Sequence, residues 1–400
     1  MKHRQKKSKA GPKPEGRKTS VKANHPEPPV VLSTGRKWLF RFIALVVLPL
    51  LLLGGTEAAL RLAGYGYSTS FFKKIRVEGK DYFINNENFT LRFFPPQLAR
   101  WPDPFIFPAV KPPGTIRIFI FGESAAMGDP QPSYGASRYM EVLLRQRFPE
   151  KKFEVINLGI TAINSHVILP IARDCARHDG DFWIVYMGNN EMVGPFGAAT
   201  VFGAKALPRS LVRFNLALQE TRTGQLLVNT VRHLAGKSKN TSWGGMGMFI
   251  ENQIPPGDPR KETVYQNFAA NLHDIVATGM KSGAKVILNT VAVNLKDSPP
   301  FASLNNSNLP AADLQRFEQA FAGGKTLQSQ SKQLTAADKF DQAIQLDPQY
   351  AEAHFRLAQC DLALGNTNAA AEFQQACDLD ALPFRTQRDA GHWTCANAGS

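Results

Sequence analysis

Apolar runs and helical patterns alternate along the middle of the chain. Four short segments are apolar at nearly every position, as strands buried on both faces of a parallel sheet are, and they lie at 115–122, 153–157, 181–187 and 284–293. Apolar residues recur at helical spacing between them, at 133–148, 164–177 and 261–282. Strands that alternate with helices predict right-handed crossovers and a doubly wound parallel sheet in three α/β/α layers, of the flavodoxin-like kind.

Each of the first three predicted strands ends in a turn of small and polar residues. The turns are Gly122-Glu123-Ser124, Asn157-Leu158-Gly159 and Gly188-Asn189-Asn190-Glu191. Because parallel strands end at one edge of their sheet, we expect these turns to meet in the crevice where open α/β sheets bind ligands. The alternative for Ser124 is an ordinary strand-to-helix loop, and the alternative for Asn190 is an ordinary turn residue.

A different apolar pattern lies near the N-terminus. No charged residue occurs between 42 and 55, and the apolar stretch extends from 38 to 56 around Arg41. That length approaches the ~20 residues that a membrane-spanning helix needs, provided that Arg41 snorkels toward the cytoplasmic face. We expect an uncleaved anchor over 38–62, with the N-terminus in the cytoplasm and the rest of the chain outside it. A cleaved signal peptide and a buried core helix are the alternatives.

Most of the net charge of +14 is confined to the N-terminal segment. Residues 1–41 hold 12 Lys and Arg against two Glu, which accounts for +10 of the total. With its Pro, Gly and Ser, the segment 1–37 is predicted to be a disordered cytoplasmic tail that contacts anionic headgroups. The adjacent basic block also fits the positive-inside rule for the anchor. The remainder is only mildly basic, so we expect no nucleic-acid partner.

The pattern changes again near residue 316, beyond which Ala, Gln and Leu are frequent and no strand is predicted. Two Ala–aromatic–Ala sets lie 33 residues apart, at Ala336, Phe340, Ala343 and at Ala369, Phe373, Ala376. This spacing is close to the tetratricopeptide period, and 338–380 resembles such repeats. We expect tetratricopeptide-like helices over 316–382 that dock on the α/β domain and offer a surface to a protein partner. A generic Ala-rich hairpin is the alternative.

The three turns also resemble the first three sequence blocks of the SGNH (GDSL-like) hydrolase family. That family has Gly-Asp-Ser, then a Gly after the second strand, then Gly-x-Asn-Asp after the third. Carried over position by position, the resemblance implies that Ser124 is a nucleophile. It also implies an oxyanion hole made of the amides of Ser124 and Gly159 and the side chain of Asn190, whose donors would stabilise the charge that develops in acyl transfer. Glu123 and Glu191 stand where the family usually has Asp, and they keep the carboxylate on a longer side chain.

The same family carries an Asp-x-x-His block after a fifth strand, followed by a closing helix. Here Asp389 and His392 match that spacing, but no unassigned strand precedes them and no helical pattern follows. We therefore expect the true block to be absent and the hydrolase-like domain to be incomplete at its C-terminal end. The alternative is that His392 is the general base for Ser124 and is oriented by Asp389.

Other chemically reactive residues form no recognisable motif. His166, His178, His233, His273 and His354 lack metal-ligand spacing and are expected to be structural. The four cysteines show no Cys-x-x-Cys pairing, and Cys360 with Cys377, predicted on facing helices, is the pair to test for a disulfide. The sequence holds no phosphate loop, nucleotide fingerprint or metal cluster. We therefore predict no cofactor and no metal.

These expectations divide the chain into six parts. They are a basic tail (1–37), an anchor (38–62), a lead-in segment (63–114), an SGNH-like α/β domain (115–310), repeat helices (316–382) and a C-terminal tail (383–400). Within the α/β domain, a Gly-rich insertion with two helices is expected at 195–256. The expected function is that of a membrane-anchored extracytoplasmic esterase or deacetylase, acting on a small-molecule or polysaccharide ester. The alternatives are an O-acyltransferase of cell-surface polysaccharide on the same fold and a non-catalytic repeat scaffold.

Overall fold

A computed structural model describes residue 11 and residues 33–234 and 242–385 of the 400-residue chain. The chain divides into two compact units, Met1–Thr56 and Glu57–Ser400. Asp389 and His392 lie outside the described residues, so the structure does not place the predicted terminal block.

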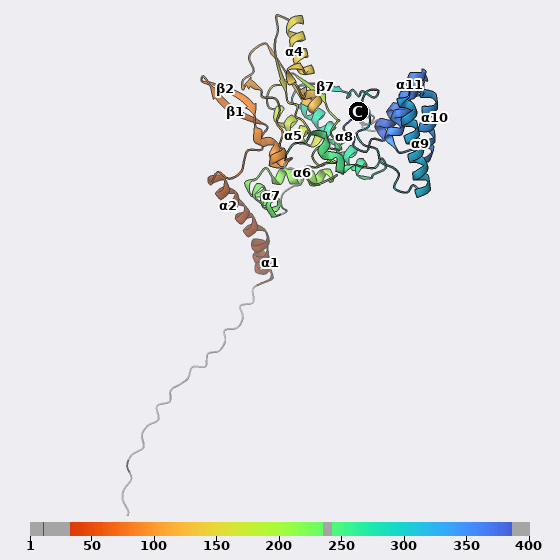
Figure 1. Ribbon diagram of the computed structural model, residues 1–400. Coiled ribbons are helices and arrows are strands. Elements are labelled where there is room, and N and C mark those ends of the chain that lie inside the picture. The colour runs from red at the N-terminus through yellow and green to blue at the C-terminus, as the bar shows by residue number, and fades with distance from the viewer. Residues whose placement is uncertain (1–10, 12–32, 235–241, 386–400) are drawn as a thin grey trace, which may run out of the picture. The chain divides into compact units, whose positions relative to one another are not determined.

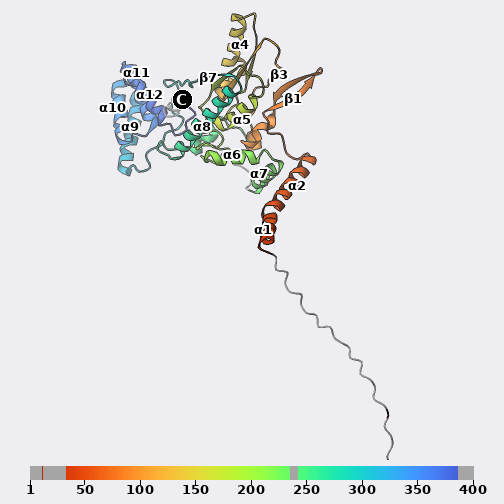
Figure 2. The ribbon, with the colours of Figure 1, turned by 180° about the vertical axis from the view of Figure 1, so that it is seen from behind.

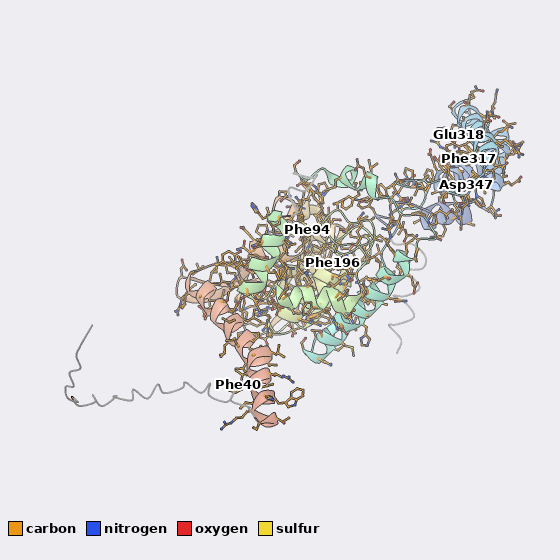
Figure 3. The ribbon with its side chains drawn as sticks, turned by 90° about the horizontal axis from the view of Figure 1, so that it is seen from below. Phe40, Phe94, Phe196, Phe317, Glu318 and Asp347 are labelled. Atoms are coloured by element: carbon orange, nitrogen blue, oxygen red, sulfur yellow. The ribbon has the colours of Figure 1, made fainter. Side chains whose placement is uncertain are left out.

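A single long helical stretch covers the predicted anchor. It consists of α1 (Thr34–Phe42), a π-helical segment η1 (Ile43–Val47) and α2 (Leu48–Leu62). This helical stretch of 29 residues is long and apolar enough to cross a membrane, and an 18-residue window within it has a mean hydropathy of 2.2. Figure 3 labels Phe40, whose side chain is 55% exposed although it is fully apolar. An apolar N-terminal helix is therefore present, as a signal anchor or a signal sequence requires.

The lead-in segment forms a small antiparallel sheet that the sequence analysis did not predict. Its strands are β1 (Phe72–Val77), β2 (Lys80–Asn85) and β3 (Ile106–Pro108), in that order. Glu78 and Gly79 join β1 to β2, and both have positive φ, as a tight two-residue hairpin turn requires. Two short 3₁₀ helices follow β2, η2 (Glu87–Arg92) and η3 (Pro96–Leu98).

Four parallel strands form the central sheet, in the order β5-β4-β6-β7. They are β4 (Thr115–Gly122), β5 (Lys152–Asn157), β6 (Phe182–Tyr186) and β7 (Lys285–Asn289). All four correspond to predicted apolar runs, although β7 ends four residues earlier than predicted. The pairs Ile120↔Asn157 and Gly122↔Tyr186 place the ends of β4, β5 and β6 side by side. The predicted meeting of the three turns at one edge is therefore confirmed at the level of the backbone.

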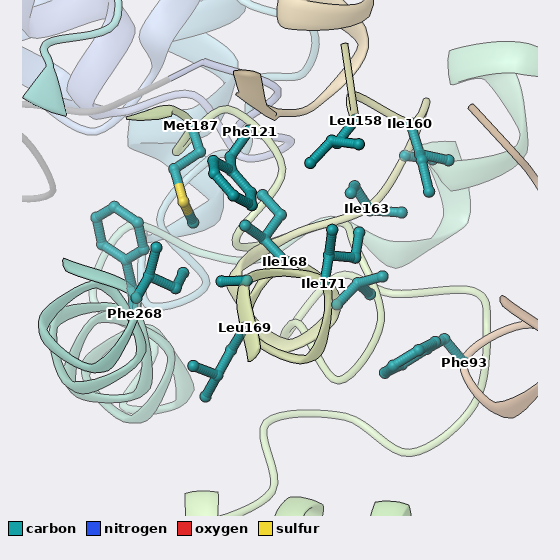
Figure 4. Close-up of a cluster of buried hydrophobic side chains, with 14 of the residues drawn as sticks. Phe93, Phe121, Leu158, Ile160, Ile163, Ile168, Leu169, Ile171, Met187 and Phe268 are labelled. Atoms are coloured by element: carbon teal, nitrogen blue, oxygen red, sulfur yellow. The ribbon is translucent and has the colours of Figure 1, made fainter. Parts of the chain in front are cut away.

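Helices pack on both faces of this sheet. On one face, α5 (Ser165–Cys175) and α8 (Arg260–Lys281) cover the buried side chains of Phe121 and Trp183. Figure 4 shows this core, with Ile168 of α5 directed toward Phe121 and Phe268 of α8 facing the same cluster. On the other face, α4 (Ala136–Arg147) contacts a smaller cluster of strand residues. Figures 1 and 2 show α4 separated from α5 and α8 by the strands.

The remaining α/β segment contains shorter elements between β6 and α8. They are α6 (Arg209–Leu218), α7 (Arg222–Leu234) and the 3₁₀ helix η5 (Gly245–Asn252). The two helices match those predicted in the Gly-rich insertion. The short elements α3 (Ser124–Met127) and η4 (Pro132–Tyr134) lie between β4 and α4.

Four helices follow, and they pair as two helical hairpins. They are α9 (Ala311–Ser329), α10 (Gln333–Leu346), α11 (Ala351–Leu364) and α12 (Ala369–Asp378). The first begins five residues before the predicted start at 316. Gly324 lies against the ring of Phe340, where a Cβ atom would be 2.6 Å from that ring. Phe317, labelled in Figure 3, stacks on Phe321 within the same core.

The residues after α12 contact the α/β part. Leu382 belongs to its hydrophobic core, and the amide of Ile254 donates to the carbonyl of Ala381 at 2.7 Å. The carboxylate of Asp380 accepts from the amides of Phe301 at 2.9 Å and Ala302 at 3.1 Å. The expected attachment of the repeat helices to the α/β domain is thus made by the segment that follows them.

Candidate functional site

Ser124 stands at the point where the central strand β4 gives way to a helix. Gly122 makes the turn possible, because a Cβ atom there would lie 2.1 Å from the carbonyl oxygen of Tyr186. The chain then turns at Glu123, and Ser124 is the first residue of α3. Ser124 is half-buried. Its hydroxyl therefore lies at a carboxyl end of the sheet, within reach of solvent and of a small ligand.

Glu123 connects this turn to the one that follows β6. Its side chain is 1% exposed, and its two carboxylate oxygens accept from the amide of Gly188 at 3.2 Å and the amide of Asn189 at 2.8 Å. These bonds fix the Gly188–Glu191 turn beside the residue that precedes Ser124. Glu123 thus has a definite structural role, which is to join the first and third turns.

Asn190 is buried at this edge with an unused hydrogen-bond donor. The residue is 6% exposed, and its side-chain Nδ2 has no hydrogen-bond partner among the residues that the structure describes. A buried amide donor without a partner costs free energy, and each such group in a folded protein calls for an explanation, of which a catalytic role is one. An oxyanion that forms beside Asn190 would supply the missing acceptor.

Gly159 lies at the same edge, but its amide has a partner. The N–H of Gly159 donates to the side-chain Oδ1 of Asn157 at 3.0 Å. Asn157 in turn donates through Nδ2 to the carbonyl of Ala126 at 2.8 Å and to Oγ of Ser137 at 2.9 Å. The amide that the sequence assigned to the oxyanion hole is therefore engaged in this structure. The Gly159 amide can donate to a ligand only if its hydrogen bond to the Asn157 side chain is shared or broken.

Glu191 belongs to a buried polar network that the sequence did not predict. Its carboxylate accepts from both the amide and the hydroxyl of Ser165, each at 2.8 Å. Asn271 of α8 donates to the Ser165 hydroxyl at 3.0 Å and lies 3.2 Å from Nδ1 of His166. Arg209 then donates to Oδ1 of Asn271 at 2.8 Å. The network thus fixes the end of the Asn190 turn to α5, α6 and α8.

The two glutamates that flank Ser124 and Asn190 are shifted toward their neutral forms. Burial, together with the nearby charge of Glu191, raises the pKa of Glu123 to about 8, against the opposing effect of the backbone N–H donors. Burial raises the pKa of Glu191 to about 7, despite the hydrogen bonds from Ser165. Burial and the charges of Arg209 and Arg213 lower the pKa of His166 to about 4, so this imidazole is neutral at physiological pH.

The stability of the fold is expected to fall as pH rises through the range in which Glu191 titrates. An unfolded Glu ionises near pH 4.5, whereas Glu191 in the fold stays protonated until about pH 7. Between these two pH values ionisation of this carboxyl stabilises only the unfolded state. The free energy of unfolding therefore falls by about 3 kcal/mol at most. Glu191→Gln retains a side-chain oxygen that accepts from the Ser165 amide, and its side-chain NH2 group bonds the Ser165 hydroxyl. Thermal unfolding at pH 5 and pH 7 should show wild type losing stability relative to this variant.

The exposed Glu150 supplies the matched control for this measurement. Glu150→Gln should unfold at the same temperature as wild type at both pH values. Equal pH dependence in wild type and Glu191→Gln would show that Glu191 is ionised in the fold throughout.

No hydrogen bond joins a histidine to Ser124 within the described ranges. His166 bonds Asn271, and His354 lies between Glu372, at 2.7 Å from Nδ1, and the carbonyl of Pro348, at 3.0 Å from Nε2. The predicted base His392 and its partner Asp389 fall outside the described residues. In that same described part of the chain, no cluster of three or more His, Cys, Asp or Glu could hold a metal ion.

Cys360 and Cys377 are both buried, and no disulfide joins them in the structure. The disulfide that the sequence suggested testing is therefore not formed. Burial raises the pKa of the Cys377 thiol to about 11. Such a thiol is a poor nucleophile at neutral pH and behaves as a packing residue.

Comparison with known proteins identifies the helical repeat. A tetratricopeptide-repeat family model matches residues 334–383, which cover α10, α11 and α12. No curated protein and no solved structure matches the chain. The predicted tetratricopeptide helices are therefore confirmed over residues 334–383, and this architecture is one that presents extended surfaces to protein partners.

Proposed function

We propose that this chain is a membrane-anchored hydrolase of the SGNH type that acts on ester bonds outside the cytoplasm. The observation that carries the proposal is the buried, unpartnered amide of Asn190, which lies on the turn that Glu123 joins to Ser124. The strand order β5-β4-β6-β7, with helices on both faces, is compatible with the doubly wound fold of that family. The proposal extends the resemblance of the three turns to a chemical role for each.

The chemistry follows from these positions. The Oγ atom of Ser124 attacks the ester carbonyl carbon, and the carbonyl π electrons move to the oxygen. The Nδ2 group of Asn190 and the amide of Ser124 donate to that oxyanion. The amide of Gly159 donates to it as well when its hydrogen bond to Asn157 is broken. Collapse of the intermediate expels the alcohol with a proton and leaves the acyl group on Ser124. Water, or the hydroxyl of a sugar, then takes the acyl group.

A base must accept the proton of Ser124 for this attack, because a serine hydroxyl is a weak nucleophile. Because no hydrogen bond joins a described histidine to Ser124, the proposal takes up the alternative of the sequence analysis and assigns this role within this chain to His392, with Asp389 as the group that orients its imidazole. Support for the assignment comes from the Asp-x-x-His spacing of these residues. Glu191 and His166 are unsuited to the role, since their polar groups are committed to Ser165 and Asn271.

An assay of the purified full-length chain on p-nitrophenyl acetate tests the proposal. A hydrolase should release nitrophenol and acetate in equal amounts, with or without an added oligosaccharide. An O-acyltransferase should instead form an acetyl ester on the oligosaccharide, detectable by mass spectrometry. His392→Ala should remove either activity, and His273→Ala, at an exposed histidine on α8, is the control. Release no faster than in buffer, under both conditions, would refute the proposal.

The repeat helices support a second function beside the first. The tetratricopeptide match over residues 334–383 indicates that α10, α11 and α12 bind a protein partner. This function does not exclude catalysis, because the segment after α12 attaches the repeat to the α/β part. The repeat would then hold the hydrolase beside a partner that supplies or carries the ester.

A further inference from the structure

The polar side of helix α7 (Arg222–Leu234) contacts the rest of the protein. Gln225 is 1% exposed, and its side chain bonds both the amide and the carbonyl of Tyr67 at 3.0 Å. Asn229 donates to the hydroxyl of Tyr65 at 3.1 Å, and Arg232 donates to the carbonyl of Leu91 at 3.4 Å. A surface helix ordinarily buries its apolar side and exposes its polar side. This helix has the opposite arrangement.

The apolar side of α7 faces outward. Leu227, Val231 and Leu234 recur at i, i+4 and i+7, so they form one stripe, and they are 54%, 56% and 79% exposed. The preceding helix α6 (Arg209–Leu218) adds Leu211 and Phe214, which are 52% and 67% exposed. We call these five side chains the α6–α7 apolar face. A monomer in water gains nothing by exposing such a face, which marks it as a binding surface.

Glu57, in the C-terminal part of α2, contacts the start of α7. Glu57 is the first charged residue after the uncharged run that begins at Phe42. Its carboxylate accepts from the amide of Arg222 at 3.0 Å and from the amide and hydroxyl of Thr223 at 2.9 and 3.0 Å. If 34–62 spans the membrane, a charged residue that ends the apolar run lies at the membrane–water boundary. The start of α7 is therefore held at that boundary.

Charge favours the same partner. Residues 209–234 contain four arginines and one glutamate, and two of these arginines, Arg209 and Arg213, pair with Asp274 of α8. A helix pair that combines an exposed apolar stripe with basic residues is typical of segments that lie in the headgroup region of a bilayer. Anionic headgroups attract such basic residues within a Debye length of the surface.

We infer that the α6–α7 apolar face docks on the outer surface of the same membrane that the N-terminal helix crosses. Leu227, Val231 and Leu234 enter the boundary between headgroups and acyl chains, while the polar side of α7 holds the α/β part above them. The inference rests on the proposed anchor for its geometry. It goes beyond that anchor because it adds a second contact with the membrane and states which side of the α/β part faces the lipid.

A fluorescent label on Val231 tests the docking in the full-length chain. We would reconstitute a Cys395→Ser background into lipid nanodiscs, since the cysteines at 175, 360 and 377 are buried, and attach an environment-sensitive nitrobenzoxadiazole group to Val231→Cys. We expect a several-fold gain in emission with a blue shift, and quenching by lipids brominated near the headgroup. The effect should be larger with anionic than with zwitterionic lipid. Leu334→Cys, an equally apolar site that is 65% exposed on α10, should show none of this.

A third label, at Leu45→Cys within the predicted span, separates the two proposals. A label at 45 that is quenched by deeply brominated lipid, with a label at 231 that behaves like the one at 334, would overturn the docking and leave the anchor standing. A label at 231 in lipid with a label at 45 in water would support the docking and overturn the membrane-spanning anchor. If both labels are in water, the docking and the anchor are both overturned. A blue shift at 231 that no brominated lipid quenches would indicate a contact with a second copy and would also overturn the docking.

Discussion

Ser124→Ala is expected to abolish covalent labelling of the full-length chain by a fluorophosphonate probe. The probe reacts with a serine whose oxygen is activated and placed beside oxyanion donors. Ser124 is half-buried at the end of the central strand, on the turn that Glu123 bonds to the turn bearing Asn190. Removal of its hydroxyl breaks no hydrogen bond that the structure assigns to that side chain, so the fold should be unaffected. Intact-mass spectrometry of treated protein measures the result directly.

Ser133→Ala is the matched control, because Ser133 is an exposed serine in the same connection between β4 and α4. This variant should label as wild type does. Labelling that survives in Ser124→Ala, at an unchanged rate, would assign the reactive hydroxyl to another residue and remove the basis of the proposed nucleophile.

The parallel sheet could be predicted because its strands carry their own signal. Each is a short apolar run that ends in Gly, Asn or Ser, and helical spacing separates one from the next. The repeat helices carry a comparably strong signal, since Ala336 and Phe340 recur at one repeat period as Ala369 and Phe373. In both cases the signal is the spacing of buried residues within each element, which a single sequence records.

The antiparallel sheet of β1, β2 and β3 was missed because its strands are short and largely exposed or half-buried, so none of them carries a continuous apolar run. The hairpin turn is made by Glu78 and Gly79, both at positive φ, and Glu-Gly is not one of the Asn-Gly or Asp-Gly pairs that signal a two-residue turn in a sequence. The pairing of β2 with β3 joins Phe83 to Phe107 across 24 residues. The guanidinium of Arg117, fully buried within the apolar run of β4, bonds Glu154 and the carbonyls of Pro108 and His178. No spacing in the sequence indicates those partners.

The candidate site divides in the same way. The backbone meeting of the three turns was predictable from the order of the strands, whereas the hydrogen bonds of their side chains were not. Asn157 occupies the Gly159 amide from two residues away, and Asn271 reaches Ser165 from a helix more than a hundred residues later. These partners depend on how helices pack against the sheet. Sequence motifs record which residue types meet, but they do not record which donors are already satisfied.

Asn190→Ala is expected to lower ester turnover by about 10²–10³-fold, the usual effect of removing one oxyanion donor. The argument depends on the state of Nδ2 in the free protein. Because this buried donor has no partner in the described structure, its removal costs the fold no hydrogen bond. The thermal unfolding temperature of the variant should therefore remain close to that of wild type. A large loss of kcat with little change in stability is the expected signature of a donor reserved for the transition state.

Asn189→Ala is the control for this prediction, because Asn189 precedes Asn190 and contributes its backbone amide to Glu123, a bond that alanine retains. Its turnover should stay within a few fold of wild type. Steady-state kinetics on p-nitrophenyl acetate, with thermal unfolding of the same samples, distinguishes the outcomes. Unchanged kcat in Asn190→Ala would assign the oxyanion to other donors. Equal losses of kcat in both variants would instead mean that the shape of the Gly188–Glu191 turn, rather than the amide of Asn190, governs the rate.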